Sequence, residues 1–240
     1  MTLLYRQVAE KLLSEFEAVN CHDGALLPSE AQLQQAFGIS RTTVRRALAY
    51  LEAGGHVHRR QGLGSFYRSR KLGNLISGRI GFHGVARNSG HHAFTRVHAF
   101  RTRAANLSEL TVFGPAARDG VVELQRVRIL DSRPAMFQQS VLCHVGLAKL
   151  RRSDFENVSL YTLLRNRFGV VVTKVSTKLE ALNAPEDIAA IMAIEPGTAV
   201  FNSHRMVEDQ NGRYIELCNN FARSDSVYFF FSGSAEEFSA

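Results

Sequence analysis

Hydrophobic and polar positions follow two different periods along this chain. Near the amino terminus an apolar residue recurs every four positions, at Leu4, Val8, Leu12 and Phe16. Such spacing places these side chains on one side of a helix, and similar helical spacing returns twice before residue 55. After residue 75 the pattern changes to alternation with a period of two, which is typical of strands. We therefore expect a helical amino-terminal part followed by a larger part built on a sheet.

Two short helices with a tight turn between them are predicted after the first helix. Ser29 and Gln32 have the spacing of a capping box, so a helix should begin at Glu30 and end at Gly38. Ser40 then caps a second helix. The apolar positions of this second helix are three or four residues apart: Val44, Ala47, Leu48 and Leu51. Two helices joined by a glycine-containing turn are typical of a helix-turn-helix, whose second helix enters the major groove of DNA.

The other side of that second helix is basic and polar. Its amino-terminal turns contain Arg41, Thr42, Thr43, Arg45 and Arg46, and none of these is an apolar position of the helix. Arginine can donate two hydrogen bonds to guanine, threonine offers a hydroxyl and a methyl group to base edges, and both reach phosphate oxygens. These five side chains are therefore candidate DNA contacts.

A basic hairpin follows the second helix. His56–Arg60 and Ser65–Arg68 indicate two short strands around a turn of sequence QGLG, which is typical of a β-wing. From Arg41 to Lys71 there are eight basic residues and one acid, so this stretch accounts for the whole net charge of +7. A polyanionic partner explains the concentration of charge, because each phosphate contact releases counterions. The alternative is a solvated run of charge on the surface.

The stretch from Leu27 to Tyr67, LPSEAQLQQAFGISRTTVRRALAYLEAGGHVHRRQGLGSFY, resembles the winged helix-turn-helix of the GntR family of bacterial transcription regulators. By this resemblance Arg41, Thr42, Thr43 and Arg45 correspond to contacts of the family's recognition helix, and Gln61 and Gly62 correspond to the tip of its wing. Two positions depart from the family's pattern: Ala31 stands where many members have arginine, and Arg46 stands where many have Glu or Gln. The operator sequence therefore does not follow from the resemblance.

The second part of the chain predicts an antiparallel sheet with a few helices. Six runs are strand candidates: Phe94–Arg103, Val121–Leu130, Ala135–Cys143, Val170–Leu182, Ala199–Glu208 and Arg213–Ala222. Asp131–Pro134 and Asp209–Gly212 indicate hairpin turns between them. Helices are expected at Leu160–Phe168 and directly after Pro185. Strands with helices on one face make an α+β domain.

The polar segment Ser69–Ser77 separates the two patterns and indicates a linker. We expect a DNA-binding domain over residues 1–70, a linker over 71–77, and an effector-binding and dimerisation domain over 78–240. The second domain resembles that of the HutC subgroup of the same family in VVELQRVRILDSRPAMFQQSVL, ALNAPEDIAAIMAIEPGTAVFNSHR and YIELCNNFARSDSVYF. This resemblance implies the fold of chorismate lyase. Arg45-Arg46 and the segment around Phe82 further resemble regulators of phosphonate use within the subgroup.

A pair of arginines is the main clue to a ligand. Alternation along Val121–Leu130 places Arg126 and Arg128 on one side of the strand among apolar residues. A partly buried arginine pair needs an anion nearby, which is either an internal acid such as Glu180 or Glu216 or a ligand phosphate, phosphonate or carboxylate.

The resemblance favours the ligand. By it, Arg126 and Arg128 match arginines that hold acidic effectors in this subgroup, and Glu216 matches a position that contacts the effector's polar end. A structural role for Glu216 stays open. The segment that contains Arg87 and Thr95 is expected to be a loop at the mouth of the pocket, so these two residues are further candidates.

Several other classes of site and protein lose support. His83, His91, His92 and His98 lack the spacing of metal ligands, and Cys21, Cys143 and Cys218 form neither a disulfide framework nor a zinc motif. No apolar run approaches the roughly 20 residues that span a bilayer, and no signal peptide is evident, so we expect a cytoplasmic protein. No motif of catalysis or of a cofactor site is found.

We therefore predict a regulator, usually a repressor in this family, that binds double-stranded operator DNA as a homodimer. The two recognition helices would lie one helical turn apart, roughly 34 Å, and a small anionic effector would control the affinity. Two alternatives are a chorismate-lyase-like enzyme domain fused to a DNA-binding head, and an architectural DNA-binding protein without sequence preference.

Overall fold

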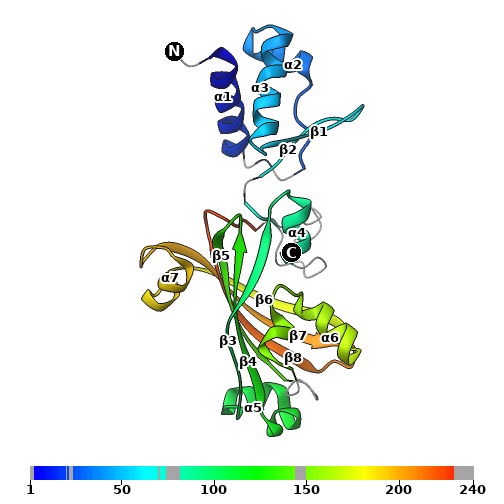
Figure 1. The fold of residues 1–240 in the computed structure, drawn as a ribbon, viewed down its shortest axis with the longest axis vertical. Coiled ribbons are helices and arrows are strands. Elements are labelled where there is room, and N and C mark those ends of the chain that lie inside the picture. Colours follow the sequence, from blue (N-terminus) through cyan, green and yellow to red (C-terminus); the bar gives the residue numbers. More distant parts are fainter. Residues whose placement is uncertain are drawn as a thin grey trace, which may run out of the picture. The chain divides into compact units, whose positions relative to one another are not determined.

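The computed structural model describes residues 3–19, 21, 24–69, 71–73, 82–143 and 150–229, apart from the side chain of Asn88. These residues form two compact units, the first extending to Gly73 and the second running from Phe82 to Tyr228 (Figure 1). Residues 74–77 of the predicted linker lie outside the described residues. The bounds predicted for the two domains therefore stay a prediction.

The first unit contains three helices and a two-stranded wing: α1 (Leu4–Ala18), α2 (Glu30–Phe37), α3 (Arg41–Ala53), β1 (Val57–Arg60) and β2 (Gly64–Tyr67). The predicted start of α2 is confirmed, because the capping box of Ser29 and Gln32 is present. Gly38 ends α2 with a φ of 61°, a conformation that glycine adopts without a steric penalty.

The core of the first unit joins α1 to α3. Its buried residues include the predicted apolar positions of α3 and three of the four predicted for α1: Val8, Leu12, Phe16, Val44, Ala47, Leu48 and Leu51. Leu4 was wrongly expected on the buried side; it is 56% exposed, because α1 begins at this residue. In the wing, β1 and β2 pair antiparallel from Val57 with Tyr67 to Arg60 with Gly64. The first wing strand is one residue shorter than predicted, and the second has the predicted length but begins and ends one residue earlier.

The second unit is an antiparallel six-stranded sheet with helices on both faces. Its strands are β3 (Ala93–Arg103), β4 (Val121–Leu130), β5 (Arg133–Leu142), β6 (Val172–Asn183), β7 (Ala199–Asp209) and β8 (Tyr214–Arg223). They lie side by side in the order β3-β4-β5-β8-β7-β6. All six predicted strands are present, with their ends shifted by up to two residues. The predicted two-domain α+β fold is therefore confirmed, but the expectation of helices on one face of the sheet is wrong, because α5 and α7 pack on the face opposite α6.

The helical segments of the second unit are more numerous than predicted. They are α4 (Phe82–Asn88), α5 (Leu107–Phe113), η1 (Gly114–Asp119), η3 (Arg152–Phe155), α6 (Leu160–Phe168) and α7 (Glu186–Met192). The helices α6 and α7 are the two that the pattern predicted. The helix α5 was missed because Leu107 and Leu110 are 81% and 37% exposed, so its apolar residues give no clear buried stripe.

The two faces of the sheet are covered differently. On one face, α6 and η3 pack through Phe155, Leu160 and Leu164 onto residues such as Leu124 and Leu142. On the other face, α7 packs near one end of the sheet and α5 with η1 near the other end (Figure 1). Because side chains alternate along each strand, every strand presents one set of residues to α6 and another to the opposite face.

We expect Asn106→Ala to lower the free energy of unfolding by about 1 kcal/mol. Asn106 caps α5, since its Oδ1 accepts a hydrogen bond of 2.9 Å from the amide of Glu109, and alanine removes that acceptor. Urea denaturation followed by circular dichroism measures the change. The control is Leu107→Ala on the same helix, which should change the value by less than about 0.5 kcal/mol. Equal losses in both variants would contradict the capping role.

Candidate DNA-binding surface and ligand site

The helix α3 presents its basic residues to solvent. The side chains of Arg41 and Arg45 are 71% and 63% exposed. Thr42 and Arg46 are also exposed, whereas Thr43 is half-buried because its amide and hydroxyl hydrogen-bond to the Oγ of Ser40, the cap of the helix. The local fold thus leaves four of the five predicted DNA contacts open.

A carboxylate of the preceding helix orients two of these arginines. Glu30 at the start of α2 lies 3.2 Å from Nε of Arg41 and 3.8 Å from Nε of Arg45. Exposed ion pairs of this kind stabilise the fold little. They do connect α2 to the exposed side of α3, so the two helices of the motif are linked by charge as well as by their apolar core.

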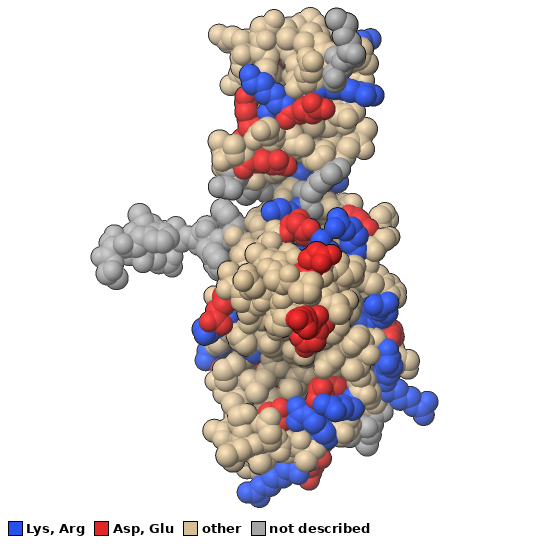
Figure 2. Space-filling model, turned by 90° about the vertical axis from the view of Figure 1, so that its left-hand side faces the viewer, with Lys and Arg blue, Asp and Glu red and all other residues tan. Residues whose placement is uncertain are grey.

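The tip of the wing is exposed as well. Gln61, Gly62 and Leu63 form the turn, and all three are exposed. Gly62 has a φ of 76°, which favours glycine at this position. On the strand before the turn, the guanidinium of Arg60 lies 5.4 Å from the centre of the Phe66 ring. On the face drawn in Figure 2, basic and acidic side chains of the larger unit are interspersed.

The arginine pair of β4 lies on the face of the sheet that α6 partly covers. Arg126 is 1% exposed and Arg128 is half-buried. Both donate from Nη2 to the same acceptor, Oε1 of Gln138 on β5, at 2.6 Å and 2.9 Å. One neutral amide oxygen therefore receives hydrogen bonds from two cations.

The charges of this pair are poorly compensated. Burial lowers the pKa of Arg126, and burial together with the charge of Arg126 lowers the pKa of Arg128 to about 9. The Nε and Nη1 atoms of Arg126 are buried and have no hydrogen-bond partner in the described part of the chain. Neither arginine forms an ion pair with a carboxylate that the structure describes. Such a site has donors and positive charge to offer an anion.

The two internal acids considered as partners do not neutralise the pair. Glu180 on β6 contacts Lys178 at 2.7 Å and His204 at 3.6 Å, both on the opposite face of the sheet. Glu216 on β8 is buried on the same face as the arginines, and its charge opposes the lowering of both arginine pKa values. It makes no hydrogen bond to either arginine that the structure describes.

Glu216 is held by two hydroxyl groups. The Oγ of Ser140 donates to Oε1 at 2.6 Å, and the Oη of Tyr161 on α6 donates to Oε2 at 2.6 Å. Burial and the charge of Glu216 raise the pKa of Tyr161 well above its usual value, so this phenol stays protonated and remains a donor. Sequence reasoning missed Ser140 and Tyr161, since their relation to Glu216 depends on strands and a helix far apart in the chain.

The helix α4 borders the arginine pair. The guanidinium of Arg128 lies 5.1 Å from the centre of the Phe82 ring, and Nε2 of His83 lies 2.9 Å from Oγ1 of Thr95. Thr95 is 0% exposed and is paired with Arg128 across β3 and β4. Burial, followed by the charge of Arg128, lowers the pKa of His83. His83 is therefore a neutral side chain near pH 7.

The loop predicted at this place is wrong. Phe82–Asn88 is helical and β3 begins at Ala93, so the segment is ordered by α4 and the edge strand of the sheet. The structure brings Thr95 to the arginine pair, but it leaves Arg87 exposed.

The histidines of this segment are dispersed. His83 contacts Thr95, His91 contacts Asp131 at 2.5 Å, and the ring of His98 lies 5.8 Å from that of Phe137. No group of three metal-binding side chains occurs among the described residues. Within the same residues no helix is long and apolar enough to cross a membrane.

A third arginine that sequence reasoning missed lies on the same face of the sheet. Arg205 on β7 is paired with Cys218 on β8 and with Thr177 on β6. Its Nε and Nη2 atoms are buried and have no hydrogen-bond partner in the described ranges. The sequence signal was the alternation of Ser203, Arg205 and Val207 along one strand, which by itself does not show which side of the sheet is the ligand side.

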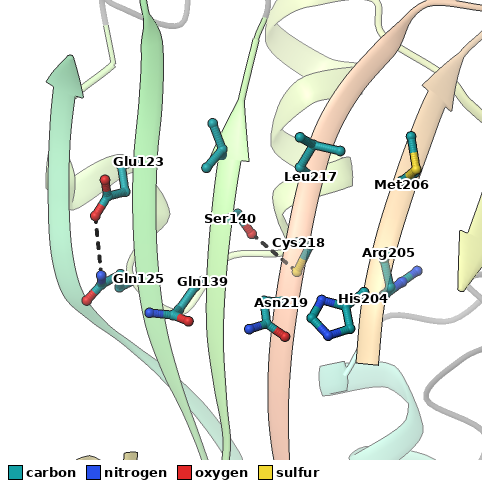
Figure 3. A pocket seen from close by; sticks show the side chains of 11 residues that line it. Glu123, Gln125, Gln139, Ser140, His204, Arg205, Met206, Leu217, Cys218 and Asn219 are labelled. Carbon is teal, nitrogen blue, oxygen red and sulfur yellow. Dashed lines mark hydrogen bonds between the residues drawn. The ribbon is translucent and has the colours of Figure 1, made fainter. Parts of the chain in front are cut away.

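The opposite face of the sheet contains a shallow groove of about 430 Å³ (Figure 3). The polar side chains of Gln125, Gln139, Asn219 and His204 lie across neighbouring strands there. Its acid, Glu123, is already paired with Arg101 at 2.9 Å and with Arg103 at 2.8 Å. The acid of this groove is therefore compensated by its neighbours, whereas Arg205, which also borders the groove, has two atoms without a hydrogen-bond partner among the described residues.

Comparison with known proteins covers both parts of the chain. Residues 4–66 match the model of the bacterial regulatory proteins of the gntR family, and residues 88–228 match the UTRA domain. The HTH-type transcriptional repressor NagR of Bacillus subtilis is 25% identical, over 94% of this chain and 93% of that protein. The probable fructoselysine utilization operon transcriptional repressor of Escherichia coli is 27% identical, over 94% of this chain and 92% of that protein.

A solved structure has the same fold. The crystal structure of PhnF from Mycobacterium smegmatis superposes with a TM-score of 0.65 at 24% identity, and the match covers 97% of this chain and 100% of that one. At this identity the similarity concerns the fold alone. It supports the two-domain architecture, with a helical unit followed by a six-stranded antiparallel sheet.

We expect Tyr161→Phe to lower the free energy of unfolding by about 1–3 kcal/mol, because the buried carboxylate of Glu216 loses one of its two donors. Urea denaturation of the ligand-free protein measures the change. Tyr214→Phe, a half-buried tyrosine at the start of β8, is the control and should have little effect. Unchanged stability of Tyr161→Phe would show that this hydrogen bond contributes nothing.

Proposed function

This chain belongs to the GntR family of bacterial regulatory proteins and has a UTRA effector domain, and on that premise we propose how its DNA binding is controlled. It is a DNA-binding transcription regulator controlled by a ligand, like relatives of nearly its full length that are named repressors. We propose that it represses, that it binds its operator as a homodimer, and that its effector is a small anion. The unpartnered donors of buried Arg126 are the main support for the last of these.

The proposed DNA contacts are those of the recognition helix and the wing. They are Arg41, Thr42, Thr43, Arg45 and Arg46 on α3 with Gln61 and Gly62 at the wing tip. The exposure of Arg41, Arg45 and the wing tip supports this proposal. A homodimer would present two such surfaces to a palindromic operator, with half-sites about 34 Å apart. Because bacterial operator DNA lies in the cytoplasm, we propose that location as well.

The proposed effector site is the arginine face of the sheet. Arg126 and Arg128 would bind a phosphate, phosphonate or carboxylate group, because guanidinium donates to such groups in pairs. Gln138 would share its hydrogen bonds with the ligand, and Glu216 would accept from a polar end of the ligand. Thr95 would lie beside the anion, whereas Arg87 would reach it only if its exposed side chain turns inward.

Control of DNA affinity follows from differential binding. An anion that neutralises Arg126 and Arg128 stabilises the conformation in which these two groups lie together. If that conformation holds the two recognition helices at a spacing unsuited to the operator, the anion lowers DNA affinity. The loss in binding free energy is set by the difference between the anion's affinities for the two conformations.

We favour regulation over catalysis. The relatives that match nearly the whole chain are regulators, and the buried carboxylate Glu216 has both of its oxygens engaged by hydroxyl groups. A carboxylate held in this way is suited to recognition of a ligand. The chorismate lyase likeness concerns shape and does not transfer activity.

We expect Arg41→Ala and Arg45→Ala each to weaken operator binding by about tenfold or more, since a good arginine contact to a base contributes roughly 1–3 kcal/mol. Fluorescence anisotropy with the DNA upstream of the protein's own coding region measures the affinity. The control is Arg118→Ala, an exposed arginine of η1 in the second unit, which should leave binding unchanged. Sedimentation of the complex should give two chains per duplex.

Binding by either recognition-helix variant at the strength of the wild type would refute the assignment of α3. A salt series separates phosphate contacts from base contacts. Each lost phosphate contact lowers the slope of log affinity against log salt by about 0.9. A stoichiometry of one chain per duplex would contradict the homodimer.

We expect Arg126→Met to abolish stabilisation by anionic ligands while leaving the free protein at least as stable as before. Replacing an unpaired buried charge with an apolar side chain is often neutral or stabilising. A thermal-shift panel of 2-aminoethylphosphonate, glucose 6-phosphate and citrate tests both parts. The control is Arg96→Met, an exposed arginine on β3. A lower melting temperature of Arg126→Met, together with no response of the wild type to any of the three anions, would contradict the ligand role.

A further inference from the structure

Two groups of unpartnered polar atoms lie on the arginine face. One consists of Nε and Nη1 of Arg126. The other consists of Nε and Nη2 of Arg205 together with Oγ1 of Thr177, the residue paired with Arg205 across β6 and β7. All of these atoms are buried and lack hydrogen-bond partners in the described part of the chain. Buried donors without partners are rare in folded proteins and call for an explanation.

The two groups flank the same central side chains. Strand pairing leads from Arg126 to Gln138, and from Ser140 through Cys218 to Arg205. Tyr161 and Cys218 each interact electrostatically with both Arg126 and Arg205. Burial and Glu216 raise the pKa of Cys218 to about 11, and Arg205 opposes that rise. Arg126 and Arg205 therefore belong to one site with Cys218, Tyr161 and Glu216 between them.

The separation of the two groups suits a short ligand. The strand β7 is three strands away from β4, which is about 14 Å in a sheet, and Arg205 is offset by two residues, about 7 Å, along the strands. The Cα atoms are thus about 16 Å apart by this geometry. The two guanidinium groups come closer together than the Cα atoms where these long side chains lean toward each other.

The positive charge of the face is also divided between two places on the sheet. It contains three guanidinium groups, those of Arg126, Arg128 and Arg205, together with the carboxylate of Glu216. Guanidinium has donors and no acceptor, so a neutral apolar end of a ligand would leave Arg205 unsatisfied. Burying an uncompensated charge is costly, and a second acidic group of the ligand removes that cost.

We propose that the effector is a small molecule with two acidic groups joined by a short linker. One group binds Arg126 and Arg128, and the other binds Arg205 and Thr177. This inference rests on the proposed effector site. It narrows the ligand to a bis-acid and assigns Arg205 as the residue that selects the second acid.

Isothermal titration calorimetry of the full-length protein tests the proposal. The probes are phosphonoacetate, 3-phosphonopropionate and 4-phosphonobutyrate, with propylphosphonate as the monoacid matched in length to the second. We expect the wild type to bind at least one of the bis-acids about tenfold more tightly than propylphosphonate. Arg205→Met should remove this preference and leave the affinity for propylphosphonate within about twofold, because Arg205 acts on the second acid alone.

Two further variants serve as controls for the titration. Arg205→Lys keeps a positive charge and should retain part of the preference. Arg213→Met, an exposed arginine in the hairpin between β7 and β8, should behave as the wild type. Circular dichroism of each variant establishes that it is folded before the titration is interpreted.

The outcomes distinguish this inference from the proposed function. Two results overturn the inference but leave the anion site of Arg126 intact. One is that the wild type binds propylphosphonate as tightly as every bis-acid. The other is that the Arg205→Met variant keeps the preference for a bis-acid. Failure of every bis-acid to bind at millimolar concentration also overturns it. If Arg126→Met binds the probes as the wild type does, the proposed effector site itself is wrong.

Discussion

The candidate ligand site of the second unit depends on positive charge that is buried without a matching negative charge. Arg126 and Arg128 lie side by side on β4 and share one amide oxygen of Gln138. Burial and the neighbouring cation lower the pKa of Arg128 to about 9, so the charged form is disfavoured there. The ring of Phe82 and the nearby charge of Glu216 offset part of this cost. An anion bound at this place would supply the negative charge that the free protein lacks beside Arg126 and Arg128.

The surrounding hydrogen bonds engage the acid on this face of the sheet, so it does not pair with the arginines. Ser140 and Tyr161 donate to the two oxygens of Glu216, and this carboxylate forms no ion pair with an arginine among the described residues. Glu180 points to the opposite face of the sheet, where it is paired with Lys178 and His204. In the groove on that opposite face, the acid Glu123 is paired with Arg101 and Arg103. The two faces of the sheet thus differ in how their charged side chains are paired.

In the first unit the positive charge is exposed to solvent and not buried. The caps at Ser29 and Ser40 start the two helices of the motif, and a compact apolar core holds α3 against α1. Arg41 and Arg45 stay at the surface, restrained by Glu30. Local signals dominate this unit, and for that reason its elements could be predicted closely: capping residues and apolar periods act within one or two helical turns.

In the second unit the sequence by itself determined the strands, the two helices α6 and α7, and the shared face of Arg126 and Arg128, because alternation along a strand is a local property. It did not reveal α5, whose Leu107 and Leu110 face solvent, or the helical state of Phe82–Asn88. Only the tertiary structure decided that Gln138 accepts from both arginines of the pair and that Arg205 lies on the same face of the sheet. Both placements follow from the order β4-β5-β8-β7, in which β5 pairs with a strand about 80 residues further along the chain, as from Gln138 to Cys218. Such pairing is set by the packing of the whole sheet, and no period within one segment encodes it.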